Sequence, residues 1–152
     1  MTPRLDYFSV APQAFNLLLE QESYLRQTFE KVPTLSVATW ELVKLRVSQI
    51  NQCSFCVDMH SHEAMKQGET AERLIGLSAW QELLVYSETE RAALLWAEAL
   101  TVNQPIDDAL YLETINVLGK EGVVNLTIAV NAINSWNRIA KTFKPEIGSL
   151  SQ

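Results

Sequence analysis

The chain has 152 residues, of which 47% are hydrophobic and 20% are charged, and its formal net charge is −6 at pH 7. This length predicts one domain, residues 1–152, that can bury an ordinary core without disulfide cross-links, and the negative charge argues against nucleic acid and anionic membranes as partners. No run approaches the ~18 apolar residues of a membrane span and no signal peptide is recognisable, so we expect a cytoplasmic protein with reduced thiols.

Helical patterns dominate the first half of the chain. Apolar residues recur at helical spacing from Pro12 to about Phe29, and a proline fits the first turn of a helix. A second helix is expected over residues 36–50 and, after a turn at 51–52, a third over 53–67 that ends at Gly68.

The second half continues in the same way. A short helix is expected over residues 71–80, and Ser87 and Glu90 form a capping box that begins a helix ending near residue 100. Asp107 is expected to cap a further helix that Gly119 interrupts, and the last helix covers residues 121–143. No strand-like alternation persists, so the sequence predicts an all-α, single-domain bundle of about six to seven helices.

The most informative pattern is E-x11-C-x2-C-x3-H, formed by Glu41, Cys53, Cys56 and His60. A helix turns about 100° per residue, so the two cysteines and the histidine, at i, i+3 and i+7, share one face. Cα atoms on adjacent turns lie roughly 5–6 Å apart, inside the ~4.4–6.8 Å range of a disulfide. A histidine one turn beyond Cys56 can raise its thiolate fraction. The pattern therefore predicts a reactive dithiol.

Glu41 precedes Cys53 by twelve residues, which is too far for contact along one helix. It reaches the site only if the chain turns back at 51–52 and the two helices pack antiparallel; otherwise it is a solvated residue. Two inert, buried cysteines are the alternative to a dithiol. Zinc is a weaker interpretation, because His62 points about 160° away from Cys56 on a helix and the spacing is not that of a zinc finger. We expect no metal and no organic cofactor.

The segment from Glu41 to His60, ELVKLRVSQINQCSFCVDMH, resembles the core motif of AhpD-like alkylhydroperoxidases, within the carboxymuconolactone decarboxylase superfamily. Further blocks near residues 79–101 and 126–138 are similar to the family's later helices, so the resemblance covers about residues 35–143. It implies an all-helical fold, with an antiparallel helix pair at the site, that assembles as a homotrimer or homohexamer. It also implies a thiol peroxidase or disulfide oxidoreductase.

The four roles of the family's motif fall on Glu41, Cys53, Cys56 and His60, position by position. One departure stands between the cysteines, where AhpD peroxidases carry a second histidine and this chain has Phe55. A phenylalanine cannot relay a proton. The departure implies slower peroxidase activity, or a relay through water from Glu41 to His60.

The leading hypothesis is a thiol peroxidase in which His60, backed by Glu41, takes the proton from Cys56. The thiolate attacks a hydroperoxide, Cys53 then forms the disulfide, and an external dithiol reduces it. In the family that reductant can be a lipoyl-bearing adaptor protein. Cys53 competes for the attacking role, but the helix dipole contributes only ~0.3–1 kcal/mol, whereas general-base help is typically worth about 10²–10⁴-fold.

Two other functions remain open at this point. One is a decarboxylase-type proton-transfer enzyme that acts on a small lactone or acid with His60 as the base. The other is a non-catalytic helical oligomerisation module whose cysteines are inert. The family resemblance implies a homo-oligomer, and four tryptophans in a 47% hydrophobic chain, more than one small bundle needs, support the same expectation.

Overall fold

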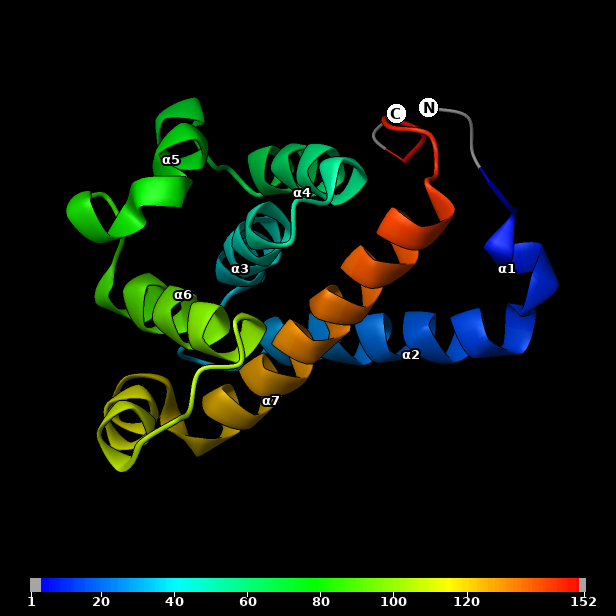
Figure 1. Cartoon of the computed structure of the whole chain (residues 1–152). Helices are drawn as coiled ribbons and strands as arrows, with labels where there is room; N and C mark the ends of the chain where they lie inside the picture. Colours follow the sequence, from blue (N-terminus) through cyan, green and yellow to red (C-terminus); the bar gives the residue numbers. More distant parts are fainter. Residues whose placement is uncertain (1–3, 151–152) are drawn as a thin grey trace.

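Helices form nearly all of the regular structure in the computed structural model of the chain, which describes residues 4–150 (Figure 1). In chain order they are α1 (Tyr7–Val10), α2 (Pro12–Phe29), α3 (Val37–Ile50), α4 (Ser54–Lys66), α5 (Ala71–Gly76), the 3₁₀ helix η1 (Leu77–Glu82), α6 (Glu88–Thr101) and α7 (Asp108–Phe143). No strand occurs among these residues, so the all-α class predicted from the sequence is confirmed. None of the described helices is long and apolar enough to cross a membrane.

Most helix ends coincide with the signals in the sequence. The Ser87 side chain accepts from the Glu90 backbone N–H at 3.2 Å, and the Glu90 carboxylate accepts from the Ser87 N–H at 2.8 Å, which completes the capping box at the start of α6. The Asp107 carboxylate accepts from the Leu110 N–H at 2.8 Å and caps α7. Gly119 has φ 72° and ψ 163°, outside the helical region, and α7 changes direction there (Figure 1).

Two short elements differ from the prediction. The four residues of α1 were not predicted, because so short a segment contains barely one helical period. The segment expected as one helix over 71–80 divides into α5 and η1, where Ala79 has non-helical dihedral angles of φ −122° and ψ 29°. Neither difference affects the elements that carry the motif.

The centre of the bundle is α3, which packs against α4, α6 and α7. Apolar side chains surround this helix on most sides, a pattern typical of a helix buried in a core. Its buried residues also include four polar ones, Thr39, Glu41, Lys44 and Ser48. Because a buried polar group costs free energy unless it is hydrogen-bonded, each of these must have a partner inside the bundle.

A polar seam fixes the turn between α3 and α4 to the last helix. The Asn51 amide donates to the side-chain oxygens of Asn134 and Asn137, both at 2.9 Å, and the Asn137 amide donates to Ser48 Oγ at 3.0 Å. Lys141 Nζ donates to the Asn51 carbonyl at 2.7 Å. These contacts set the position at which α4, and with it the cysteine pair, begins.

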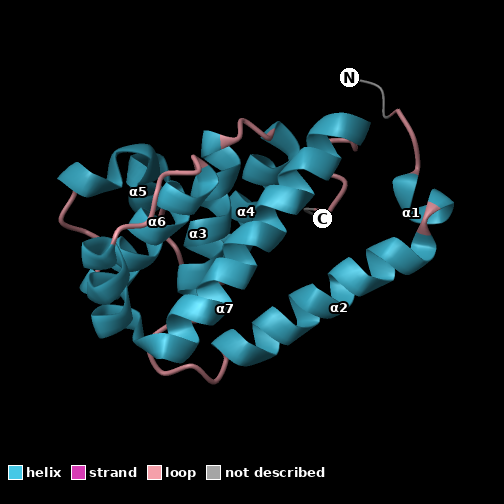
Figure 2. Cartoon of the chain, turned by 60° about the horizontal axis from the view of Figure 1, so that its bottom comes forward, coloured by secondary structure: helices cyan, strands magenta, loops and turns pink. Residues whose placement is uncertain are grey.

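The first two helices lie on the outside of the bundle, where α2 contacts α7 and the two helices cross at an angle (Figure 2). Tyr24 Oη donates to the Asn125 side chain at 2.7 Å, and Trp136 Nε1 donates to the Glu22 carboxylate at 3.1 Å. The start and the end of the described chain meet, because the Arg4 N–H donates to the Phe143 carbonyl at 3.0 Å. This arrangement brings α1 against the C-terminal end of α7.

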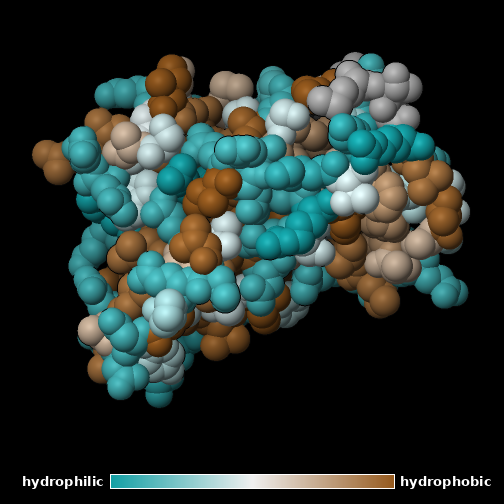
Figure 3. All heavy atoms as spheres, viewed as in Figure 1, coloured by the Kyte–Doolittle hydropathy of each residue, from teal (hydrophilic) through white to brown (hydrophobic). Residues whose placement is uncertain are grey.

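The outer helices expose apolar surface. Figure 3 shows hydrophobic side chains gathered at the end of the molecule formed by α1 and the start of α2. The large apolar residues exposed on these elements and just before them are Leu5, Phe8, Val10, Leu17, Leu19 and Tyr24. Contiguous apolar surface of this kind usually marks a contact with another molecule.

Candidate active site

The two cysteines lie at the N-terminus of α4 and are joined by a disulfide bond, with a Cα–Cα distance of 5.3 Å. This distance confirms the spacing expected from the sequence. Cys53 is the N-cap rather than the first helical residue, and its sulfur accepts from the Cys56 backbone N–H at 3.4 Å. The dihedral angles of Cys53 are extended, so the helix begins one residue later than predicted. The helix N-terminus therefore points at this sulfur, which favours negative charge on it.

Glu41 returns to the cysteine-bearing helix because the chain reverses after α3, where Gln52 adopts φ 54°. Its Oε2 lies 3.2 Å from Nδ1 of His60, and its Oε1 lies 2.6 Å from Nζ of Lys44. The exposed fractions are 1% for Glu41, 5% for Lys44 and 6% for His60. Three ionisable side chains therefore share one buried site, and two of them belong to the predicted motif.

The environment fixes the charge on each of these groups. Burial alone would raise the pKa of Glu41, but the hydrogen bond from His60 and the charge of Lys44 outweigh it, so the pKa of this carboxyl is lowered. Burial lowers the pKa of His60, and the charge of Lys44 lowers it further, against the opposing effect of Glu41. At neutral pH the site therefore contains the Glu41 carboxylate and a neutral His60 imidazole beside the Lys44 side chain.

This charge state also assigns the imidazole proton. A carboxylate can only accept, so Nδ1 of His60 carries the proton and donates it to Glu41 at 3.2 Å. The other ring nitrogen, Nε2, then carries the lone pair. A carboxylate that orients a neutral imidazole in this way prepares it to act as a general base.

Lys44 is a site residue that the analysis of the motif missed. It follows Glu41 at i+3, a spacing at which opposite charges meet on a helix, and this signal was available in the sequence. The signal is weak because most such pairs are exposed to solvent. Here Nζ also lies 3.6 Å from the ring centroid of Trp40, so the ammonium group is held between a carboxylate and an aromatic face.

Cys56 and His60 line the same cavity, whose volume is about 270 Å³. Four further charged side chains besides Glu41 line it: Glu22, Arg26, Lys44 and Glu63. The remaining lining side chains are apolar or aromatic: Tyr7, Phe8, Leu19, Phe55, Met59, Ile133, Trp136, Ala140 and Leu150. The cavity is thus largely apolar, with charged and polar side chains along part of its wall. A site of this form suits a mostly hydrophobic molecule with one polar, reactive end.

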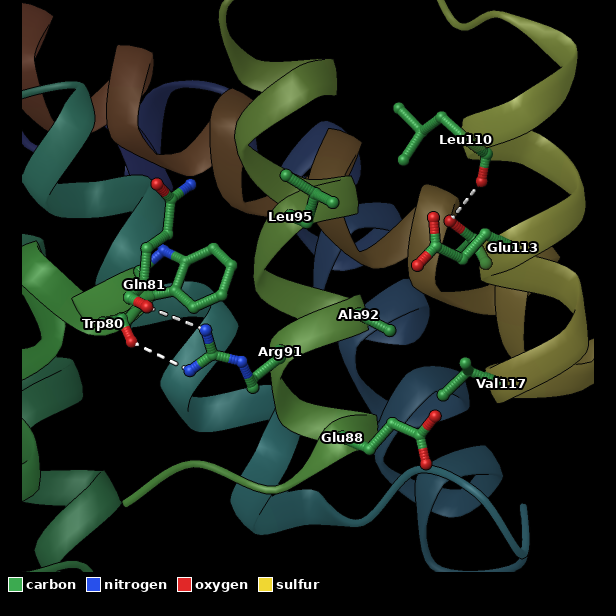
Figure 4. Close-up of a pocket in the computed structure, with 10 residues that line it drawn as sticks. Trp80, Gln81, Glu88, Arg91, Ala92, Leu95, Leu110, Glu113 and Val117 are labelled. Atoms are coloured by element: carbon green, nitrogen blue, oxygen red, sulfur yellow. Dashed lines mark hydrogen bonds between the residues drawn. The ribbon is translucent and has the colours of Figure 1, made fainter. Parts of the chain in front are cut away.

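A larger cavity of about 580 Å³ lies elsewhere, between η1, α6 and the start of α7 (Figure 4). Its prominent charged group is Arg91, whose guanidinium donates to the carbonyls of Trp80, Gln81 and Leu83 at 2.8–3.1 Å. Arg91 therefore ties η1 to α6. The residues lining this cavity in the described part of the chain include no cysteine or histidine, and we assign no chemistry to it.

The second histidine of the chain takes no part in this arrangement. Nδ1 of His62 lies 2.8 Å from the Asp58 carbonyl, and its side chain is 44% exposed. Within residues 4–150 there is no group of three or more histidine, cysteine, aspartate or glutamate side chains that could hold a metal ion. Cys53 and Cys56 are bonded to each other, and His62 lies apart from them.

The fold and the site together describe a helical protein with a disulfide-bonded cysteine pair at a helix N-terminus and a buried Glu41–His60 pair. The model of the carboxymuconolactone decarboxylase family matches residues 18–99, more than half of the chain. The uncharacterized protein YdfG of Bacillus subtilis is 39% identical over 142 residues, which make up 92% of this chain and 93% of that protein. The chain belongs to the carboxymuconolactone decarboxylase family.

A second relative and two solved structures agree with this assignment. The uncharacterized protein YnjA of Escherichia coli is 31% identical over 94 residues, which make up 61% of this chain and 52% of that protein. A crystal structure from Agrobacterium tumefaciens, of a protein of unknown function for which an AhpD-type role in antioxidant defence has been suggested, superposes with a TM-score of 0.86 at 35% identity. It covers 95% of this chain and 97% of that chain.

An uncharacterized peroxidase-related protein from Silicibacter superposes with a TM-score of 0.71 at 16% identity. It covers 90% of this chain and 73% of that chain. At this identity the likeness concerns the fold alone. The fold of the chain is AhpD-like, as the resemblance in its sequence implied.

Proposed function

We propose that this protein is a thiol-dependent hydroperoxidase in which Cys56 attacks the peroxide and Cys53 resolves the product. The observation that carries the proposal is that Cys56 and the buried Glu41–His60 pair line one cavity, with Glu41 and His60 3.2 Å apart. A thiol, an oriented base and a sheltered apolar space are the components that peroxide reduction by cysteine requires.

The reaction begins with the reduced protein. The neutral His60 accepts the Cys56 proton on Nε2, and the thiolate attacks the terminal oxygen of the hydroperoxide. The O–O bond breaks, the proton on the imidazole passes to the departing alkoxide, and Cys56 becomes a sulfenic acid. Glu41 stabilises the imidazolium while it exists. The hydrogen bond from His60 and the charge of Lys44 keep Glu41 ionised, so the carboxylate does not compete with the thiol as a proton donor.

The second half of the reaction uses Cys53. Its thiolate attacks the Cys56 sulfenic acid, water leaves, and the disulfide forms. The disulfide between these residues, whose Cα atoms lie 5.3 Å apart, supports this step because the pair bonds within a single helix terminus. An external dithiol restores both thiols by exchange. In the family this reductant can be a lipoyl-bearing adaptor protein, and no metal or organic cofactor takes part.

The cavity favours an organic hydroperoxide over hydrogen peroxide. Its apolar lining comes from α1, α2, α4 and α7, and it can bury a hydrocarbon group. Each buried CH₂ contributes about 0.8 kcal/mol, so a small alkyl or aryl group is enough to produce a clear preference. We therefore expect cumene hydroperoxide to react faster than hydrogen peroxide with the reduced protein.

Stopped-flow kinetics of the reduced protein with cumene hydroperoxide tests the mechanism. Cys56→Ser should abolish the first reaction, whereas Cys53→Ser should react once and stop as a sulfenic acid that a dimedone-type probe labels. His60→Ala should slow the first step by about 10²–10⁴-fold. His62→Ala, on the same helix with a half-exposed side chain, is the matched control and should leave the rate unchanged. A burst that survives in Cys56→Ser and disappears in Cys53→Ser would reverse the two roles.

We also propose that the protein is a homotrimer or homohexamer that acts in the cytoplasm. The exposed apolar residues of α1 and α2 support an assembly, because a second copy would cover them. A reducing compartment supplies the thiols that the cycle consumes. Light scattering coupled to size exclusion should give a mass of at least three chains, and a single 17.2 kDa species at micromolar concentration would contradict the assembly.

Proton transfer on a small lactone or acid is the second candidate, because the family includes decarboxylases and a neutral His60 in an apolar cavity is a suitable base. Such a reaction does not need the thiols. A protein with both cysteines replaced by serine should keep this activity and lose the peroxidase, so one double variant separates the two functions. Thiols that resist a small alkylating reagent at pH 7 in the reduced protein would instead favour an inert module.

A further inference from the structure

The two cysteines of the disulfide line different cavities. Cys56 lines the apolar cavity described above, whereas Cys53 lines a separate cavity of about 470 Å³. Phe55 and Ala140 line both and therefore lie between them. Each cysteine, although only 2% exposed, thus borders its own cavity, and His60 lines only the cavity at Cys56.

The cavity at Cys53 has a different character from the cavity at Cys56. It lies between the start of α4 and the segment that follows α7, and the residues that line it are Gln52, Cys53, Ser54, Phe55, Ala140, Lys141, Lys144, Pro145, Glu146 and Ile147. Two lysines face one glutamate, so this surface is locally positive on a chain whose net charge is −6. We name it the Cys53 groove.

We propose that the Cys53 groove is the entry site of the reducing dithiol, and that a dithiol with an acidic group beside its thiols attacks Sγ of Cys53 there while the peroxide uses the cavity at Cys56. The inference rests on the proposed function for the identity of the oxidant. The groove, its charge and the position of Cys53 stand independently of that function.

The reductant's first thiolate attacks Sγ of Cys53. The bond between the two cysteines breaks, and its electron pair goes to the Cys56 sulfur, which leaves as a thiolate. The second thiolate of the reductant then attacks the reductant sulfur of the mixed disulfide, which closes the reductant's own disulfide and expels the Cys53 thiolate. The two protons of the dithiol go to the protein thiols or to water, and two electrons pass to the protein.

Attack at Cys53 has a consequence that attack at Cys56 lacks. The thiolate that leaves is Cys56, which is released directly into the cavity with His60 and Glu41. The peroxide-reactive sulfur is therefore regenerated in the first of the two steps. The Cys53 thiolate that leaves in the second step lies at the N-terminus of α4, where the Cys56 N–H stabilises its charge.

The attacked sulfur can be identified directly. The oxidised protein is mixed with 2-mercaptoethanesulfonate, an anionic monothiol, then quenched in acid within milliseconds, alkylated and fragmented by tandem mass spectrometry. We expect the mercaptoethanesulfonate adduct on Cys53 and the alkyl group on Cys56. An adduct that accumulates first on Cys56 would overturn the proposal. No peroxide is present, so this result does not depend on whether the protein reduces peroxides.

Two substitutions test the separate routes. Ile147 lines the groove and is 57% exposed, and Leu19 lines only the Cys56 cavity and is 47% exposed. Ile147→Trp should slow reduction of the disulfide by dithiothreitol roughly tenfold through lost access, without changing the rate at which the reduced protein consumes cumene hydroperoxide. Leu19→Trp should do the reverse. If both variants slow the same half-reaction, the two routes are not separate and the proposal fails.

Charge is tested with a matched pair of reductants, 2,3-dimercaptopropane-1-sulfonate and the neutral 2,3-dimercaptopropan-1-ol. Lys144→Glu should lower the rate ratio of the anionic to the neutral dithiol by at least about fivefold, the effect of one unit charge at about 4 Å in water. Lys120→Glu, at an exposed position elsewhere on α7, is the control and should leave the ratio unchanged. A ratio that stays constant in Lys144→Glu would refute the acidic reductant. If the dithiols reduce the disulfide as expected but the reduced protein consumes no peroxide, the proposed peroxidase function fails and the proposal on the Cys53 groove stands.

Discussion

Replacing Lys44 with methionine should destabilise the protein far more than an ordinary ion-pair mutation does. Methionine is close to lysine in length, so the change removes the charge and leaves the volume. In the native protein Nζ of Lys44 lies 2.6 Å from the Glu41 carboxylate, and both side chains are at least 93% buried. At an effective dielectric constant near 20 their attraction is about 6 kcal/mol before desolvation. Removing one partner of a buried pair typically costs about 3–5 kcal/mol, and we expect a loss in that range.

Urea unfolding at pH 7 and a fixed protein concentration measures this loss, and the chain provides a matched control. Lys66 pairs with Glu63 at 2.8 Å with the same i,i+3 spacing, but its side chain is 57% exposed. Lys66→Met should therefore cost about 0.5 kcal/mol or less. The double variant Glu41→Gln/Lys44→Met should recover much of the stability, because no buried charge is then left unpaired. Equal losses for Lys44→Met and Lys66→Met would refute the reasoning, and so would a double variant that is only additive.

Three further predictions follow from the same structure. The pKa of His60 is lowered in the folded protein, so the unfolded chain binds the imidazole proton at a higher pH than the folded chain does. The free energy of unfolding should therefore fall as the pH drops below about 6.5, by at most about 1.4 kcal/mol per pH unit. His60→Gln should flatten this slope in urea titrations between pH 5 and 7. The lowered pKa of Glu41 acts in the same direction at more acidic pH, since its contribution is present above its ordinary pKa and is lost as pH falls through the folded value. Gly119→Ala should lower the free energy of unfolding by about 1–2 kcal/mol. The cause is the positive φ of 72° and not a steric clash, because a Cβ there would meet no atom within 4 Å. Lys120→Ala, at the exposed neighbouring position, should leave the stability almost unchanged in the same thermal unfolding assay. Ser87→Ala should cost about 1 kcal/mol through loss of the capping box, and a wild-type melting temperature for this variant would show that the cap is dispensable.

The sequence predicted the helices well because their ends carry local signals. Ser36 and Ser87 cap α3 and α6, and Gly119 breaks α7 where only a residue tolerant of positive φ fits. The elements that were missed or merged, α1 and η1, are too short for periodicity to define them. Local chemistry thus determined nearly all of the secondary structure, and tertiary contacts decided the remainder.

The site was predictable only in part, for a different reason. The spacing of Cys53, Cys56 and His60 placed them together along one helix terminus, whereas Glu41 required a turn and a helix-to-helix contact that spacing alone does not guarantee. The aromatic wall of the cavity could not be inferred from any local pattern. Tyr7 packs against Phe143 with 5.3 Å between ring centroids, across almost the whole length of the sequence.

The position of Phe55 links the departure from the AhpD pattern to the two-sided site. The resemblance places a second histidine between the cysteines in AhpD peroxidases, and here that position lines both cavities and separates them. With an apolar side chain there, His60 is the histidine that lines the cavity with Cys56, whereas His62 lies apart with its ring on the Asp58 carbonyl. Burial, aided by the charge of Lys44, lowers the pKa of His60, and the hydrogen bond from His60 together with the charge of Lys44 lowers the pKa of Glu41. Under the proposed mechanism, Phe55 and Lys44 are thus two parts of one arrangement, in which His60 acts as the single base beside the buried Lys44.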